Sequence, residues 1–197
     1  MNIDDAIRTQ DSAREEQVLA GTRRWLERAV IGLNLCPFAK AVHAKQQIHY
    51  VVYQQPDEAG LLDALIFEAA ELQAHDAQLR DTTLLIAPLA LPDFLDFNDF
   101  TARAERRLMR AGYEGVLQLA SFHPLFQFAG SEPQDIANAT NRSPYPTLHL
   151  LREDSVSRAV EAFPDAAQIF ERNIETLERL GPQGWAALDV GAKELPQ

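Results

Sequence analysis

The segment from His123 to Glu153 holds most of the residues in this chain whose types and spacing suit chemistry. It reads H-P-L-F-Q-F-A-G-S-E-P-Q-D-I-A-N-A-T-N-R-S-P-Y-P-T-L-H-L-L-R-E, and two strand-like runs flank its loop. A connection of this length is usually either functional or disordered. Because aromatic, apolar and proline residues run through it, the sequence predicts an ordered loop that holds polar side chains at a site.

Three residues are candidates for catalysis, namely Cys36, His123 and His149. Cys36 precedes Pro37, where we expect a short helix to begin. The free amides of a helix N-terminus stabilise a thiolate, so this position favours a lowered thiol pKa. Ala39 occupies the place of the second cysteine in a redox C-x-x-C motif, which excludes a dithiol oxidoreductase. The alternative for Cys36 is a buried structural cysteine.

The two histidines lie at opposite ends of the long loop, each at or inside a predicted strand. If these strands pair antiparallel, His123 and His149 are expected to come close to each other. One of them then suits the role of general base for a nearby thiol. The alternative is that each imidazole hydrogen-bonds backbone at a strand end. Their spacing matches no metal-binding motif, so no metal site is predicted.

A second set of residues suits the binding of a small anionic ligand, a carboxylate or a phosphate: Asn141, Arg142, Ser143, Tyr145 and Arg152. Ser143 and Tyr145 each precede a proline, which restrains their backbone and that of Arg142 beside them. A restrained guanidinium is well suited to grip an anion. The alternative is that Arg142 pairs with an acid such as Glu153 or Asp135 and pins the loop.

The composition limits the partners of this chain. It has 197 residues, 46% of them hydrophobic, and a formal net charge of −11. This acidic balance disfavours nucleic acid and anionic membranes as partners. The single cysteine excludes an internal disulfide, and no apolar run approaches the roughly 20 residues that span a bilayer. We therefore expect a soluble cytoplasmic protein; the sequence specifies neither a cofactor nor an oligomeric state, and no glycine-rich phosphate loop occurs.

The pattern of elements predicts an α/β fold, of mixed α+β kind. A capping pattern at Ser12 opens the first expected helix, and strands are expected at 48–53, 83–89, 115–123 and 147–152 with helices between the first three. A further short helix is expected from Ser131. Helices between strands favour parallel neighbours, whereas the last two strands can pair antiparallel. We expect a flexible lead at 1–10, one domain at 11–182 with a four-stranded mixed sheet, and a tail at 183–197.

Three runs carry a resemblance to a known family: G-L-N-L-C-P-F-A-K at 32–40, H-P-L-F-Q-F-A-G at 123–130 and N-R-S-P-Y-P-T-L-H-L-L-R-E at 141–153. The chain resembles the uncharacterised, mainly bacterial family called domain of unknown function 1415, from its first helix to about Leu180. The resemblance implies a soluble single-domain protein. It supplies no catalytic residue.

Three functions are open at this point. The first is an enzyme that acts on a small anionic metabolite, with Arg142 and Arg152 on the anion, a histidine moving protons and Cys36 as nucleophile or site wall. The second is a non-catalytic ligand- or protein-binding regulatory module. The third is a one-cysteine redox sensor, which requires a reactive thiol at Cys36.

Overall fold

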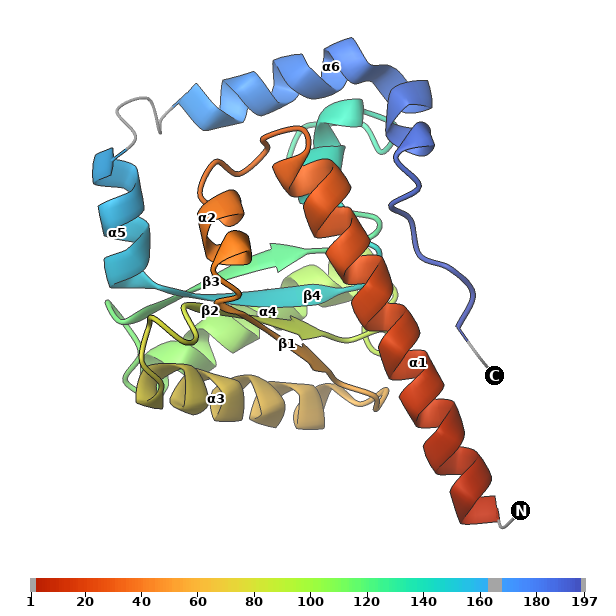
Figure 1. Ribbon diagram of the computed structural model, residues 1–197, viewed down its shortest axis with the longest axis vertical. Coiled ribbons are helices and arrows are strands. Elements are labelled where there is room, and N and C mark those ends of the chain that lie inside the picture. The colour runs from red at the N-terminus through yellow and green to blue at the C-terminus, as the bar shows by residue number, and fades with distance from the viewer. Residues whose placement is uncertain (1–2, 163–167, 196–197) are drawn as a thin grey trace.

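The computed structural model describes residues 3–162 and 168–195 and forms a four-stranded mixed sheet with helices on both faces (Figure 1). The strands are β1 (Ile48–Val52), β2 (Thr82–Ile86), β3 (Leu117–Phe122) and β4 (Thr147–Arg152). Their order in the sheet is β1-β2-β4-β3. β1 and β2 run parallel, whereas β4 pairs antiparallel with both β2 and β3. The predicted α/β fold with a mixed sheet is confirmed.

The helices follow the expected order along the chain. They are α1 (Ile3–Trp25), continued by a π-helical turn η1 (Leu26–Ile31), α2 (Ala39–Ala44), α3 (Glu58–Ala74), α4 (Phe94–Arg110), the 3-10 turn η2 (Ile136–Asn141), α5 (Glu153–Ala162) and α6 (Ile169–Ala187). Two predicted starts are wrong. α1 already begins at Ile3 rather than at Ser12, and the short helical turn of the long loop begins at Ile136 rather than near Ser131.

The larger core lies between the sheet and the pair α3 and α4, which cover one face of it (Figure 1). Asp57 and Asp93 cap these two helices by accepting hydrogen bonds from the amides of Gly60 and Leu95. Burying a leucine or phenylalanine contributes roughly 1.5–3 kcal/mol, so this cluster is the main source of stability. Its side chains include Leu61, Leu65, Leu72, Phe97, Phe100, Leu148 and Leu150.

The other face of the sheet packs against α1 and η1. Val18 contacts Leu84 and Ile86 of β2, and Trp25 meets Phe122 of β3 edge to face at 5.1 Å. The segment after α6 returns along α1, where Arg24 and Arg28 donate hydrogen bonds to the backbone oxygens of residues 189 and 188. Side chains pointing to this face of the sheet are therefore enclosed by α1 and by neighbouring segments.

Candidate functional site

The loop between β3 and β4 is ordered around Asn138, a fully buried side chain that the sequence did not single out. Its Oδ1 accepts hydrogen bonds from the amide of Phe128 at 3.0 Å and from the hydroxyl of Ser131 at 2.8 Å. Its Nδ2 donates to the carbonyl oxygen of Glu132 at 2.8 Å. A single amide thus satisfies three groups of the loop, which explains how a long connection keeps one conformation.

The side chain of Arg142 bonds two backbone carbonyls of the same loop. Its Nε donates to the carbonyl of Phe126 at 3.1 Å and its Nη2 to the carbonyl of Pro133 at 2.6 Å. The partners of this guanidinium are carbonyl oxygens, rather than the carboxylates of Glu153 or Asp135, and burial lowers its pKa. Arg142 therefore pins the loop, as one of the two readings of the sequence proposed, but through carbonyl groups.

The neighbours of Arg142 also bond to nearby backbone. The side-chain amide of Asn141 donates to the backbone carbonyl of Ser121 at 3.4 Å, and the backbone carbonyl of Asn141 accepts from the amide of His123 at 3.2 Å. The Ser143 hydroxyl donates to the carbonyl of Tyr145 at 2.6 Å. The ring of Tyr145 is buried against α1, in one cluster with Val18. These residues fasten the loop to β3 and to α1.

His123 has no exposed surface and both of its ring nitrogens are bonded. Its Nε2 donates to the carbonyl of Leu91 at 3.0 Å, since a carbonyl only accepts, and its Nδ1 accepts from the amide of Leu125 at 3.0 Å. The ring lies 4.9 Å from that of Phe97 and 5.6 Å from that of Phe94. Desolvation lowers the pKa of His123, so the neutral form is favoured in this position.

His149 lies in the middle of β4, between Leu84 of β2 and Ala120 of β3. The Thr82 hydroxyl donates to the carbonyl of Leu150 at 2.6 Å, so its oxygen accepts from Nε2 of His149, also at 2.6 Å. Desolvation lowers the pKa of His149 to about 4. This imidazole is consequently neutral at neutral pH.

The expectation that the two histidines come close is wrong, although β3 and β4 do pair antiparallel. His123 packs on Phe94 and Phe97 of α4, whereas the ring of His149 lies 6.1 Å from that of Phe122, on the face covered by α1. Side chains alternate along a strand, and the sheet separates the two imidazoles. They do not form one acid–base pair.

Cys36 is partly buried and packs into the same cluster as Trp25 and Phe122, on the His149 side of the sheet. The amides of Phe38 and Ala39 donate to its sulfur, as expected near a helix start, and both lower the thiol pKa. Burial has the larger effect, and the pKa of Cys36 is raised overall. The predicted lowering is wrong because α1 and β3 exclude water from the sulfur more strongly than two amides stabilise a thiolate.

Arg152 ends β4 on the α3 side of the sheet. Its Nη2 donates to the carbonyls of Leu72, His75 and Arg80, which ties the end of α3 to the start of β2. With Arg158 it lines a hollow of about 230 Å³, whose other walls are Ala77, Gly115, Val116 and Asp154. Arg142 does not line this hollow, so the two predicted anion-binding arginines do not share a site.

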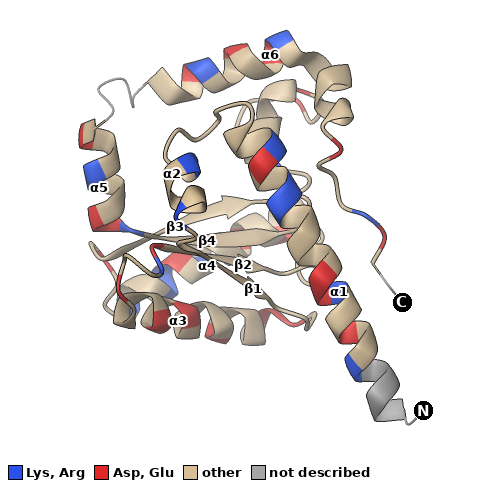
Figure 2. Cartoon of the chain, in the orientation of Figure 1, with Lys and Arg blue, Asp and Glu red and all other residues tan. Residues whose placement is uncertain are grey.

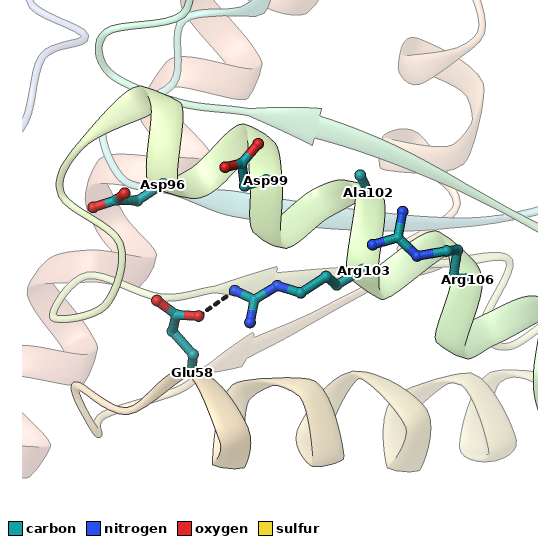
Figure 3. A pocket seen from close by; sticks show the side chains of 6 residues that line it. All are labelled: Glu58, Asp96, Asp99, Ala102, Arg103 and Arg106. Carbon is teal, nitrogen blue, oxygen red and sulfur yellow. Dashed lines mark hydrogen bonds and ion pairs between the residues drawn. The ribbon is translucent and has the colours of Figure 1, made fainter.

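A larger hollow of about 450 Å³ lies along α4, and none of the predicted site residues lines it (Figure 3). Arg103 reaches across from α4 to form an ion pair with Glu58 at the start of α3. The remaining wall is formed by Asp96, Asp99, Ala102 and Arg106. Exposed charges of both signs face this open space, which does not select one class of ligand. In the described part of the chain, no three His, Cys, Asp or Glu side chains are grouped to hold a metal.

The surface of the long loop carries a feature that the sequence did not reveal. The rings of Phe94, Phe126, Phe128 and Phe170 form a chain of contacts, here called the aromatic row, that joins α4 to α6. Consecutive ring centroids are 5.2, 5.0 and 5.6 Å apart. The available signal was the alternation F-Q-F within the loop, but only the folded chain adds Phe170.

Three large apolar side chains, in the aromatic row or next to one of its residues in sequence, are mostly exposed to solvent. Leu95 is 72% exposed and Leu125 is 60% exposed, and Phe170, which ends the aromatic row, is itself 51% exposed. His123 links the backbone of Leu125 to the segment before α4, because its ring bonds the amide of Leu125 and the carbonyl of Leu91. Exposed apolar patches mark interaction sites in many proteins.

The fold and this surface define a single α/β domain with a mixed sheet, whose long loop carries two half-buried phenylalanines and the exposed Leu125. The chain belongs to the family described as protein of unknown function DUF1415, whose model matches residues 17–187. No curated protein and no solved structure matches it. None of the helices in the described ranges is long and apolar enough to cross a membrane.

Proposed function

We propose that this protein is a non-catalytic binding module that docks a protein segment on the aromatic row. The observation that carries this proposal is the combination of a rigid loop and exposed apolar side chains. Asn138 and Arg142 hold the loop in one conformation through buried hydrogen bonds. Leu125 and Phe170 nevertheless remain largely in water. Ordering apolar groups at the surface costs free energy that a bound partner offsets.

The state of the candidate catalytic residues supports a module over an enzyme. Both ring nitrogens of His123 are bonded to backbone, and the guanidinium of Arg142 bonds loop carbonyls. A raised thiol pKa leaves Cys36 with less thiolate than a free cysteine has, which also argues against a redox sensor.

Site-specific photo-crosslinking in cells tests this proposal. A photoreactive residue at Leu125 should give a discrete crosslinked product, which disappears when Phe170→Ser is added. Phe67 is a matched control, because it is 62% exposed but lies on α3, outside the aromatic row. Phe170→Ser should unfold at the wild-type temperature, since exposed side chains contribute little to stability. A product of equal intensity at Phe67, or none at Leu125, contradicts the proposal.

One observation favours the enzyme or small-anion alternative. Arg152 and Arg158 line the 230 Å³ hollow, and neither has a carboxylate within ion-pair distance among the described residues. Inorganic phosphate titrated into the protein, followed by calorimetry, measures binding there. Under this alternative, phosphate binds the wild-type chain and Arg158→Gln weakens it at least tenfold. Absence of heat, or equal binding by the variant, argues against it.

A further inference from the structure

We infer that His123 is a pH-sensitive latch on the docking surface: when its ring gains a proton, the segment around Leu125 is released. The inference concerns the regulation of the proposed docking at the aromatic row and rests on that proposal. The latch consists of two hydrogen bonds made by one fully buried ring. The chemistry of these bonds and the contact of the ring with the aromatic row support it.

Only the neutral form of the His123 ring can make both bonds. Nε2 donates to the carbonyl of Leu91, and Nδ1 accepts from the amide of Leu125. A protonated imidazole carries a hydrogen on each nitrogen and accepts at neither. The added hydrogen on Nδ1 would point at the amide hydrogen of Leu125, so this bond is lost and the two groups repel each other. Protonation therefore opens the latch at Leu125 directly.

The other end of the latch holds an unfavourable backbone conformation. Leu91 has a φ of 55°, in the left-handed region that bulky residues rarely adopt. Such a conformation persists only where the surrounding structure holds it. The buried side chain of Leu91 and the hydrogen bond from His123 do so here. Displacement of the imidazole thus removes one of the contacts that hold the turn before α4.

The ring of His123 also contacts the aromatic row itself. It lies 5.6 Å from the ring of Phe94, which in turn lies 5.2 Å from that of Phe126. The amide of Phe126 donates to the carbonyl of His123 at 3.0 Å. An imidazole that leaves its place therefore disturbs Leu125 and the first two rings of the row together. This contact links protonation to docking.

Few charged groups act on this ring. Figure 2 shows the strands almost without charge: Arg152, at the end of β4 far from His123, is the one Lys, Arg, Asp or Glu in the four strands. In the loop, Arg142 bonds the carbonyl of Phe126. Before α4, the Asp93 carboxylate raises the pKa of His123, but desolvation has the larger effect and lowers that pKa overall. The closed latch is therefore neutral near pH 7, and proton uptake is coupled to opening.

Hydrogen exchange of the Leu125 amide, followed by NMR on the full chain from pH 7 to pH 5, tests the latch without any variant. After correction for the intrinsic pH dependence of exchange, the protection of this amide should fall at least fivefold, because the open form takes up a proton below pH 6.5. The amide of Leu85, inside β2, should remain better protected at each pH, since the latch opens locally. A flat profile at Leu125, or exchange as slow as that of Leu85, overturns the inference.

Two variants assign the response to one histidine. His123→Gln should remove the pH dependence at Leu125, because glutamine does not titrate. His149→Gln is the matched control, since His149 is also a buried histidine but lies on the opposite face of the sheet, and it should keep the dependence. A pH dependence that persists in His123→Gln, or that disappears in His149→Gln, overturns the latch.

Photo-crosslinking in cell extract separates the latch from the docking function. The product at Leu125 should be at least threefold weaker at pH 5 than at pH 7, and His123→Gln should remove this difference. If the Leu125 amide responds to pH but no product forms at either pH, the docking function fails and the latch stands. If the product is equally strong at both pH values, the latch does not regulate docking and the inference is overturned.

Discussion

The imidazoles of His123 and His149 lie on opposite faces of one sheet, and burial lowers the pKa of both. His123 joins the segment before α4 to the loop after β3. His149 joins β4 to the hydroxyl of Thr82 on β2. Both rings therefore act as neutral hydrogen-bonding groups inside the fold, and acid should destabilise the protein through them.

Stability should fall as the pH falls from 7 to 5. The pKa of His149 drops from 6.5 to about 4 on folding, so the unfolded chain takes up a proton in this range while the folded chain does not. The stabilisation is complete above pH 6.5 and is lost toward pH 4. Protonation of His149 in the unfolded chain should lower the free energy of unfolding by about 2 kcal/mol between pH 7 and pH 5. Urea unfolding at both pH values measures this loss.

His149→Gln provides the control for this measurement. In this variant the free energy of unfolding should fall by about 2 kcal/mol less between pH 7 and pH 5 than in the wild-type chain, since glutamine does not titrate. An unchanged pH dependence in His149→Gln would show that His149 is not the titrating group.

Asn138→Ala should loosen the whole loop between β3 and β4. The change leaves the partly buried amide of Phe128 and the carbonyl of Glu132 without their partner, at a cost of roughly 2–4 kcal/mol. Hydrogen exchange at residues 126–138 should accelerate, and the crosslinked product at Leu125 should become weaker. Exchange that matches wild type throughout this loop would contradict the role given to Asn138.

Cys36 should react slowly with iodoacetamide. Burial raises the pKa of this thiol above its usual value, so less thiolate forms near pH 8 than in a free cysteine. The rate should increase at least tenfold when the chain is unfolded in urea, and the folded rate should keep rising above pH 9. Rapid alkylation at pH 7, or a sulfenic acid at Cys36 after mild peroxide treatment, would instead favour the redox-sensor alternative.

Glu68 and Arg80 form a buried ion pair, with Oε2 and Nη2 2.5 Å apart, and Arg80 also donates to the Thr83 hydroxyl. Glu68→Ala should cost about 3–5 kcal/mol, because it leaves the guanidinium buried without a counter-charge. The double change to Glu68→Leu with Arg80→Met should recover most of that loss in urea unfolding. A single variant as stable as wild type would show that water reaches Arg80.

Local signals in the sequence were sufficient for most of the fold. Asp57 and Asp93 precede helices because their short side chains accept hydrogen bonds from free amides, and that chemistry is visible in the sequence. The apolar run at 83–89 was expected to form a central strand, and β2 (Thr82–Ile86) is buried along its whole length in the sheet interior. The missed start of α1 at Ile3 has a different cause, since its first residues form a polar helix without a clear apolar stripe.

The site could not be predicted in the same way, because it depends on contacts between distant residues. Residue types alone indicated that Arg142, His123 and His149 were important, but not that their partners are the carbonyls of Phe126 and Leu91 and the hydroxyl of Thr82. The raised pKa of Cys36 likewise arises from packing against other segments.

The sequence was enough to predict the order of helices and strands, the capping of α3 and α4 and the ordered character of the long loop, because these depend on interactions between near neighbours in the chain. The folded structure established which face of the sheet each histidine occupies, which groups the arginines bond and that Phe170 completes the aromatic row. Those features depend on the burial and pairing of groups that are far apart in sequence, and local patterns carry no information about which distant groups will meet.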